Sequence, residues 1–112
     1  MPSFSERLSD AVLRTKSPLV VGLDPRLESL PLTFATLVKG SIWDQAQAVR
    51  DYCCWVIDVV ANLVPAVKPQ LAFFEELGPA GTQALADVVR YAREKKLLVI
   101  GDGKRGDIGT TA

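Results

Sequence analysis

The sequence has 112 residues, of which 48% are hydrophobic and 23% charged, and its 13 Lys and Arg residues balance its 13 Asp and Glu residues. This is an ordinary globular composition, and the balanced charge gives no reason to expect binding to nucleic acid. The two cysteines, Cys53 and Cys54, are adjacent, and there is no histidine. We therefore expect two buried, reduced thiols, no zinc site and a cytoplasmic protein.

The first half of the chain predicts a helix, a buried strand and a long loop. Residues 3–14 predict an amphipathic helix, with Ser3 and Glu6 at the positions of a capping box. Residues 19–24 form a continuous apolar run that is closed by an acid and a proline, which is typical of a strand buried on both faces. Residues 26–41 predict a loop that is long for a plain connection, and such loops are often functional.

The second half predicts two more helices and two more strands. Apolar residues at helical spacing predict a helix over 43–63, and residues 66–74 predict a strand that runs into a loop. The Gly- and Pro-rich residues 78–81 predict a break before a helix over 82–96 and a buried strand over 97–100. This alternation of buried strands and helices predicts a parallel α/β fold.

Neither export nor membrane insertion is predicted. Residues 1–8 lack the apolar core of a signal peptide. The apolar run at 97–100 is far too short to span a bilayer. We therefore expect no membrane partner.

Charged residues stand at or near the end of each predicted strand. These are Asp24, then Lys68, then Asp102 and Lys104, with Asp107 on the following loop. In parallel α/β folds the carboxyl ends of the strands line the ligand site. Strand side chains alternate between the two faces, so Asp102 and Lys104 share one face. The pattern predicts a polar site at this edge of the sheet.

The alternation of acid and base also favours a particular chemistry. A lysine held between two carboxylates stays protonated, which makes it a proton donor and a poor Schiff-base nucleophile. The pattern therefore favours a reaction whose carbanion intermediate needs a proton. The alternative is that residues 102–107 form only a solvated turn and that single acids at strand ends are helix caps. Charges at three successive strand ends favour the site.

The last predicted strand resembles the signature of the orotidine 5'-monophosphate decarboxylases. Residues 99–112 match it throughout: two apolar residues, any residue, then Asp-x-Lys-x-x-Asp-Ile-Gly-x-Thr and a small apolar residue. Residues 21–25 and 67–70 look like the first and second strands of that family. The Lys-Arg-Gly-Asp-Ile-Gly segment at 104–109 and the Phe-Phe-Glu run at 73–75 are most similar to the bacterial branch of the family, which has the longer chain.

This resemblance implies an activity and a role for the charged residues. The activity is decarboxylation of orotidine 5'-monophosphate to uridine 5'-monophosphate in de novo pyrimidine biosynthesis. Asp24 would bind the ribose hydroxyls, and Lys68 would reach the ribose and join the charged network. Asp102 would lie beside the substrate carboxylate, and Lys104 would protonate C6 of the pyrimidine as carbon dioxide leaves.

The resemblance further implies a homodimer with shared sites. Asp107 would act across the interface and complete the charged network of the neighbouring subunit. Ile108 and Thr111 would also line that shared site. The family uses no cofactor and no metal, so the expected partners are a nucleotide substrate and a second copy of the chain.

The fold implied by the resemblance is a (β/α)8 TIM barrel, typically of ~250 residues. Residues 1–112 would form the N-terminal part of one such domain, with about three of its strands. Phosphate sites in these barrels usually follow the last two strands. We therefore expect this chain alone to be inactive, and we assign Arg26 and Arg105 to the surface or to loops rather than to phosphate binding.

Two other functions are compatible with the pattern. Magnesium-dependent sugar-phosphate synthases and decarboxylases of the same barrel superfamily share an Asp-x-Lys-x-x-Asp strand. The Ile-Gly-x-Thr continuation and the Lys-Pro-Gln segment at 68–70 favour the nucleotide enzyme. An inactive fragment that serves only in assembly is the second alternative, and the intact Asp102, Lys104 and Asp107 argue against it.

Overall fold

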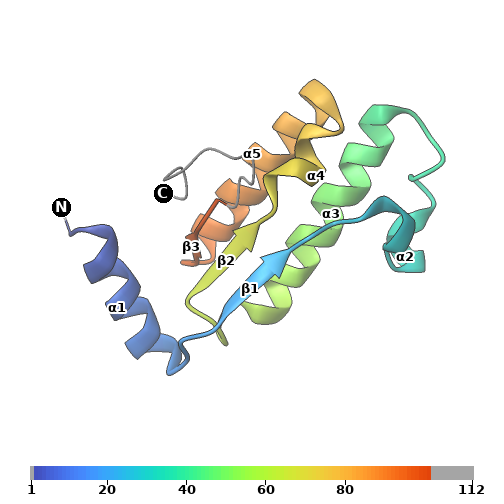
Figure 1. The fold of residues 1–112 in the computed structure, drawn as a ribbon. Coiled ribbons are helices and arrows are strands. Elements are labelled where there is room, and N and C mark those ends of the chain that lie inside the picture. The colour runs from blue at the N-terminus through green and yellow to red at the C-terminus, as the bar shows by residue number, and fades with distance from the viewer. Residues whose placement is uncertain (1, 102–112) are drawn as a thin grey trace.

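The computed structural model describes residues 2–101, which form an α/β unit around one parallel sheet (Figure 1). The strands are adjacent in the order β1-β2-β3, and both pairs are parallel. This confirms the predicted fold class. The elements are α1 (Phe4–Thr15), β1 (Val20–Leu23), η1 (Leu27–Ser29), α2 (Leu32–Ala35), α3 (Ile42–Val60), β2 (Ala66–Pro69), α4 (Leu71–Glu75), α5 (Gly78–Glu94) and β3 (Leu98–Val99).

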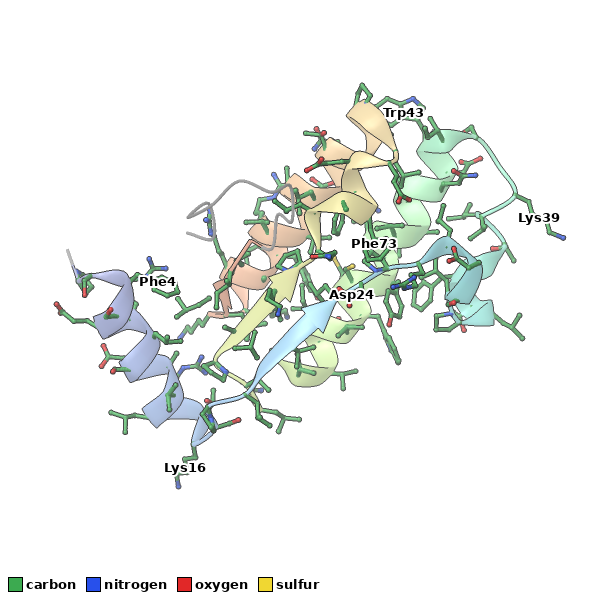
Figure 2. The ribbon with its side chains drawn as sticks, in the orientation of Figure 1. Phe4, Lys16, Asp24, Lys39, Trp43 and Phe73 are labelled. Atoms are coloured by element: carbon green, nitrogen blue, oxygen red, sulfur yellow. The ribbon has the colours of Figure 1, made fainter. Side chains whose placement is uncertain are left out.

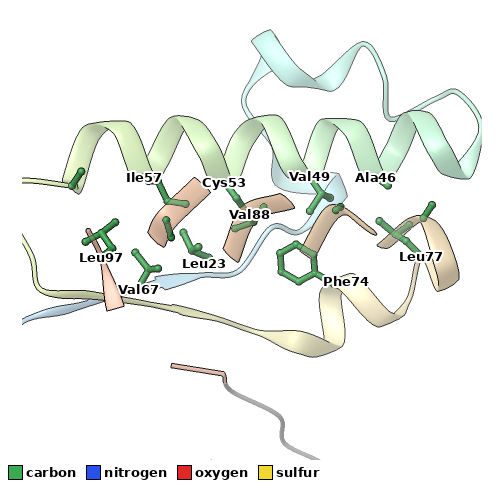
Figure 3. Packing of buried hydrophobic residues seen from close by; sticks show 14 of the residues in the cluster. Leu23, Ala46, Val49, Cys53, Ile57, Val67, Phe74, Leu77, Val88 and Leu97 are labelled. Carbon is green, nitrogen blue, oxygen red and sulfur yellow. The ribbon is translucent and has the colours of Figure 1, made fainter. Parts of the chain in front are cut away.

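Two long helices cover one face of the sheet and bury the main core with it. The chain crosses from β1 to β2 through α3 and from β2 to β3 through α5. Phe74, Ile57 and Val88 are fully buried between these layers (Figure 3). Burial of apolar side chains is the main favourable contribution to folding, so this layer fixes the sheet against the helices. Its buried members are Leu23, Ala46, Val49, Cys53, Ile57, Ala61, Val64, Val67, Phe74, Leu77, Ala80, Ala84, Val88, Ala92 and Leu97.

Serine caps begin two of the helices. At α1 the backbone N–H of Glu6 donates to the Ser3 hydroxyl oxygen at 3.1 Å. The Ser3 hydroxyl in turn donates to the Glu6 carboxylate, so the reciprocal backbone bond of the predicted capping box does not form here. The complete box lies at α3, where Asp44 N–H donates to the Ser41 hydroxyl and Ser41 N–H donates to the Asp44 carboxylate.

Two helix boundaries differ from the prediction. Helix α5 begins at Gly78, four residues before the predicted start, because Pro79 lies in the first turn, where its missing N–H costs no hydrogen bond. The residues predicted as a break are therefore helical. Helix α3 ends at Val60, and Leu63 beyond it is 62% exposed rather than part of the apolar face.

The predicted loops also contain short helices. The loop at 26–41 includes η1 and α2, and the strand predicted over 66–74 ends at Pro69, where a helical turn, α4, follows at once. Proline has no N–H to extend the ladder, which explains a strand end at this residue.

Two predictions of full burial are wrong. Val20 in β1 is 42% exposed, because α1 covers β2 and β3 rather than β1 on that face of the sheet. Cys54 is only partly buried, whereas Cys53 is buried as predicted. Both thiols are free, and within residues 2–101 no helix has the length and apolar character that crossing a membrane requires.

Candidate active site

The second face of the sheet carries the candidate site. Because strand side chains alternate, Val21 and Leu23, which belong to the core, place Gly22 on the opposite face. The register pairs Gly22 with Lys68, so the two share that face. Both residues are exposed. The face opposite the main core is therefore open at this row of the sheet.

Helix α1 closes the other end of the same face. Ala11 of α1 packs with Ala66 and Leu98, and all three are buried. Ala66 and Leu98 are paired in the register and stand one row before Lys68. The helix thus covers the amino-terminal row of β2 and β3, and the carboxyl-terminal row remains accessible.

Asp24 extends this open row at the end of β1, in the position shown in Figure 2. Both of its carboxylate oxygens would lie 3.9 Å from a Cβ on Gly22, so the carboxylate lies over the same face. Two backbone bonds hold the turn: the Gln70 N–H donates to the Leu23 carbonyl at 3.0 Å, and the Arg26 N–H donates to the Asp24 carbonyl at 2.9 Å. The structure thus brings Asp24 and Lys68, predicted site residues from separate strands, to one edge.

Asp24 and Lys68 form no ion pair with each other in the part of the chain that the structure describes. An acid and a base that share a face without a direct bond leave their charges available to a ligand with hydroxyl groups. The other predicted site residues lie outside the described residues. They are Asp102, Lys104, Asp107, Ile108 and Thr111.

An arginine and a phenylalanine connect the two loops at this edge. The Arg26 guanidinium lies 5.1 Å from the ring centre of Phe73, which is on α4. Arg26 was predicted to lie at the surface or in a loop, and it is exposed. Its contact with Phe73 was not predicted from the sequence. A cation–π contact contributes about 0.5–1 kcal/mol at an exposed site. It favours one mutual arrangement of the loops after β1 and β2.

The cysteines nearby offer no nucleophile. Burial, with smaller effects from Cys54 and the Asp24 carboxylate, strongly raises the pKa of the Cys53 thiol. Burial also raises the pKa of Cys54. Both thiols stay protonated near neutral pH, and only the thiolate is reactive. Among residues 2–101 no group of acids and cysteines is arranged to hold a metal ion.

Comparison with known proteins bears on the whole chain. The family model described as "Orotidine 5'-phosphate decarboxylase / HUMPS family" matches residues 17–112. A relative from Rhodopirellula baltica named orotidine 5'-phosphate decarboxylase is 52% identical over 100% of this chain and 37% of its own length. Another with the same name, from Deinococcus radiodurans, is 42% identical over 99% of this chain and 36% of its own. The chain thus spans little more than a third of the length of these relatives.

A solved structure has the same arrangement of elements. The Leishmania donovani OMP decarboxylase superposes with a TM-score of 0.69 at 33% identity, over 98% of this chain and 36% of that chain. This likeness bears out the expected fold class, in which β1, β2 and β3 are strands of a TIM barrel.

Proposed function

The chain belongs to the orotidine 5'-phosphate decarboxylase / HUMPS family, and on this premise we propose that the full-length protein decarboxylates orotidine 5'-monophosphate to uridine 5'-monophosphate, a step of de novo pyrimidine biosynthesis. One observation carries the proposal: Asp24 and Lys68 stand on the open face at the carboxyl ends of parallel strands. In barrels of this kind the active site lies at that end. The relatives that cover the whole chain have names that state this activity.

Asp24 and Lys68, at the carboxyl ends of β1 and β2, bind the ribose of the nucleotide. The Asp24 carboxylate accepts hydrogen bonds from the ribose hydroxyls, and the Lys68 ammonium donates to the ribose and to neighbouring carboxylates. Ionised groups make hydrogen bonds about twice as strong as neutral ones. Their exposure on the open row of the sheet is consistent with this role.

The last strand performs the bond-breaking step. The C6–carboxylate bond of the pyrimidine breaks, carbon dioxide leaves, and the electron pair remains on C6. The Lys104 ammonium stabilises this carbanion and then donates its proton to C6, and solvent reprotonates the lysine. Asp102 lies beside the departing carboxylate. The spacing of Asp102 and Lys104 in the sequence would let both side chains share one face of an extended strand.

The site is completed by a second subunit in a homodimer. Asp107, Ile108 and Thr111 reach the neighbouring subunit's nucleotide, and Asp107 adds a second carboxylate beside Lys104. Residues 1–112 form part of a single barrel domain, and the reaction takes place in the cytoplasm, where the free thiols of Cys53 and Cys54 stay reduced. The reaction uses no cofactor and no metal.

Turnover of the full-length protein tests the proposal. Purified protein is mixed with orotidine 5'-monophosphate, and release of carbon dioxide is measured with and without a chelating agent. We expect turnover that the chelator leaves unchanged. Absence of turnover contradicts the proposal, and turnover of a sugar phosphate that stops on chelation would instead indicate the magnesium-dependent class.

A further inference from the structure

Gly22 lies inside β1, where a glycine is unfavourable. A glycine in a strand interior loses more backbone freedom on folding than other residues and contributes no side chain to packing. Positive φ does not explain it, because Gly78 is the only glycine with positive φ in the described part of the chain. Any L-residue could adopt the backbone conformation of Gly22.

Close packing does not explain Gly22 either. Among the atoms of residues 2–101, a Cβ at this position would meet only the two carboxylate oxygens of Asp24, both at 3.9 Å, which is ordinary van der Waals contact. Gly81 is different, because a Cβ there would collide with the backbone of Phe74. Within residues 2–101, therefore, no atom requires a glycine at position 22.

The place of Gly22 in the sheet supplies a reason. It is paired with Lys68 in the register, shares the open face with Asp24, and stands one row beyond Val20 and Ala66. A side chain at position 22 would rise from the sheet beside Lys68 and against the Asp24 carboxylate. In strands, glycine often marks a site where a ligand approaches the backbone closely.

We propose that Gly22 is a substrate-positioning residue that admits the nucleoside part of the nucleotide to van der Waals contact with the backbone of β1, beside Lys68 and next to Asp24. This inference rests on the proposed function. The ribose lies over the Gly22 Cα so that its hydroxyls reach Asp24, and a methyl group at position 22 lifts the ribose away from that carboxylate. Displacement near 1 Å can lower a rate by roughly 100-fold.

The substitution Gly22→Ala separates this role from a structural one, because the two predict opposite effects. The melting temperature of the full-length protein should stay the same or rise, since alanine has less freedom in the unfolded chain and clashes with none of residues 2–101. Affinity for uridine 5'-monophosphate and kcat/KM should both fall by roughly 10- to 200-fold, the range for one extra methylene in a fitted pocket. The larger Gly22→Val should lower both further.

Val20→Ile is the matched control. It adds one methylene to the same face of β1, one row farther from Asp24, at a side chain that is already 42% exposed. Nucleotide affinity should be unchanged by it. An equal loss in Val20→Ile would mean that any enlargement of this face disturbs the sheet, which would overturn the proposal.

Two further outcomes would also overturn it. A folded Gly22→Ala that binds uridine 5'-monophosphate as the wild type does would show that the space is not used. A melting temperature lowered by several degrees would show that Gly22 serves the fold. If the wild type turns over orotidine 5'-monophosphate in either case, the proposed function stands and only the role of Gly22 is lost. A wild type without that activity overturns both.

Discussion

The contact between α4 and α5 makes a quantitative prediction for Gly81→Ala. Helix α5 crosses the turn α4 so closely at Gly81 that an added Cβ would lie 2.8 Å from the carbonyl carbon of Phe74, 2.9 Å from the Cβ of Leu77, and closer still to the Phe74 carbonyl oxygen. The nearest atoms belong to the backbone, which cannot turn aside as the end of a flexible side chain can. The two helices must therefore move apart.

Two opposing effects determine the size of the change. Overpacking a well-packed core costs about 1–3 kcal/mol, and a clash with backbone belongs at the upper end, about 3 kcal/mol. Replacing glycine by alanine in a helix returns up to about 1 kcal/mol. The clash dominates, so we expect the free energy of unfolding to fall by about 2 kcal/mol. That is a large fraction of a typical stability of about 5–15 kcal/mol.

Urea unfolding of the full-length protein, followed by the fluorescence of Trp43 and Trp55 on α3, measures this change. Thr82→Ala is the control, because Thr82 is the next residue of α5, is exposed, and only donates its hydroxyl to the Gly78 carbonyl at 3.3 Å. It should stay within about 0.5 kcal/mol of the wild type. An unfolding free energy of Gly81→Ala that equals or exceeds the wild type would refute the reasoning.

Two other predictions concern α3 and its contact with α5. Ser41→Ala removes the hydroxyl that caps α3 and should lower the free energy of unfolding by about 1 kcal/mol in the same urea assay, whereas an unchanged value would mean that the cap is dispensable. The hydrogen bond from the Tyr91 hydroxyl to the Asp58 carboxylate, more than burial or charge, raises the pKa of Tyr91 to about 12. An absorbance titration of the tyrosines should therefore show one phenol ionising near pH 12, and Asp58→Asn should lower that pKa; no change would exclude Asp58 as the cause.

Sequence reasoning predicted the layers well, because hydrophobic periodicity determines which faces are buried. The apolar positions of α3 and α5 and the three apolar runs were enough to predict strands, helices and their parallel order. Boundaries were less predictable. In the sequence, Pro79 is equally compatible with the end of one element and with the first turn of the next helix. Only the tertiary position of α5 decides between the two.

The positions of the site residues along the chain could be predicted, but the shape and accessibility of the surface around them could not. Strand ends predicted that Asp24 and Lys68 would lie at one edge of the sheet. In the structure Gly22 is paired with Lys68 and lies beneath the Asp24 carboxylate, which agrees with that placement. The coverage of this face by α1 at Ala66 and Leu98, and its openness beside Gly22, depend on how α1 folds back over the sheet. Likewise, nothing local in the sequence signals that Arg26 lies over Phe73.

The central claim is that this open edge belongs to a decarboxylation site in which Lys104 delivers the proton. Its most direct test is the decarboxylation rate of the full-length Lys104→Ala protein on orotidine 5'-monophosphate, compared with the wild type. A general acid contributes roughly 10²- to 10⁴-fold. We predict a loss of kcat of at least about 100-fold, whereas turnover equal to that of the wild type would contradict the account.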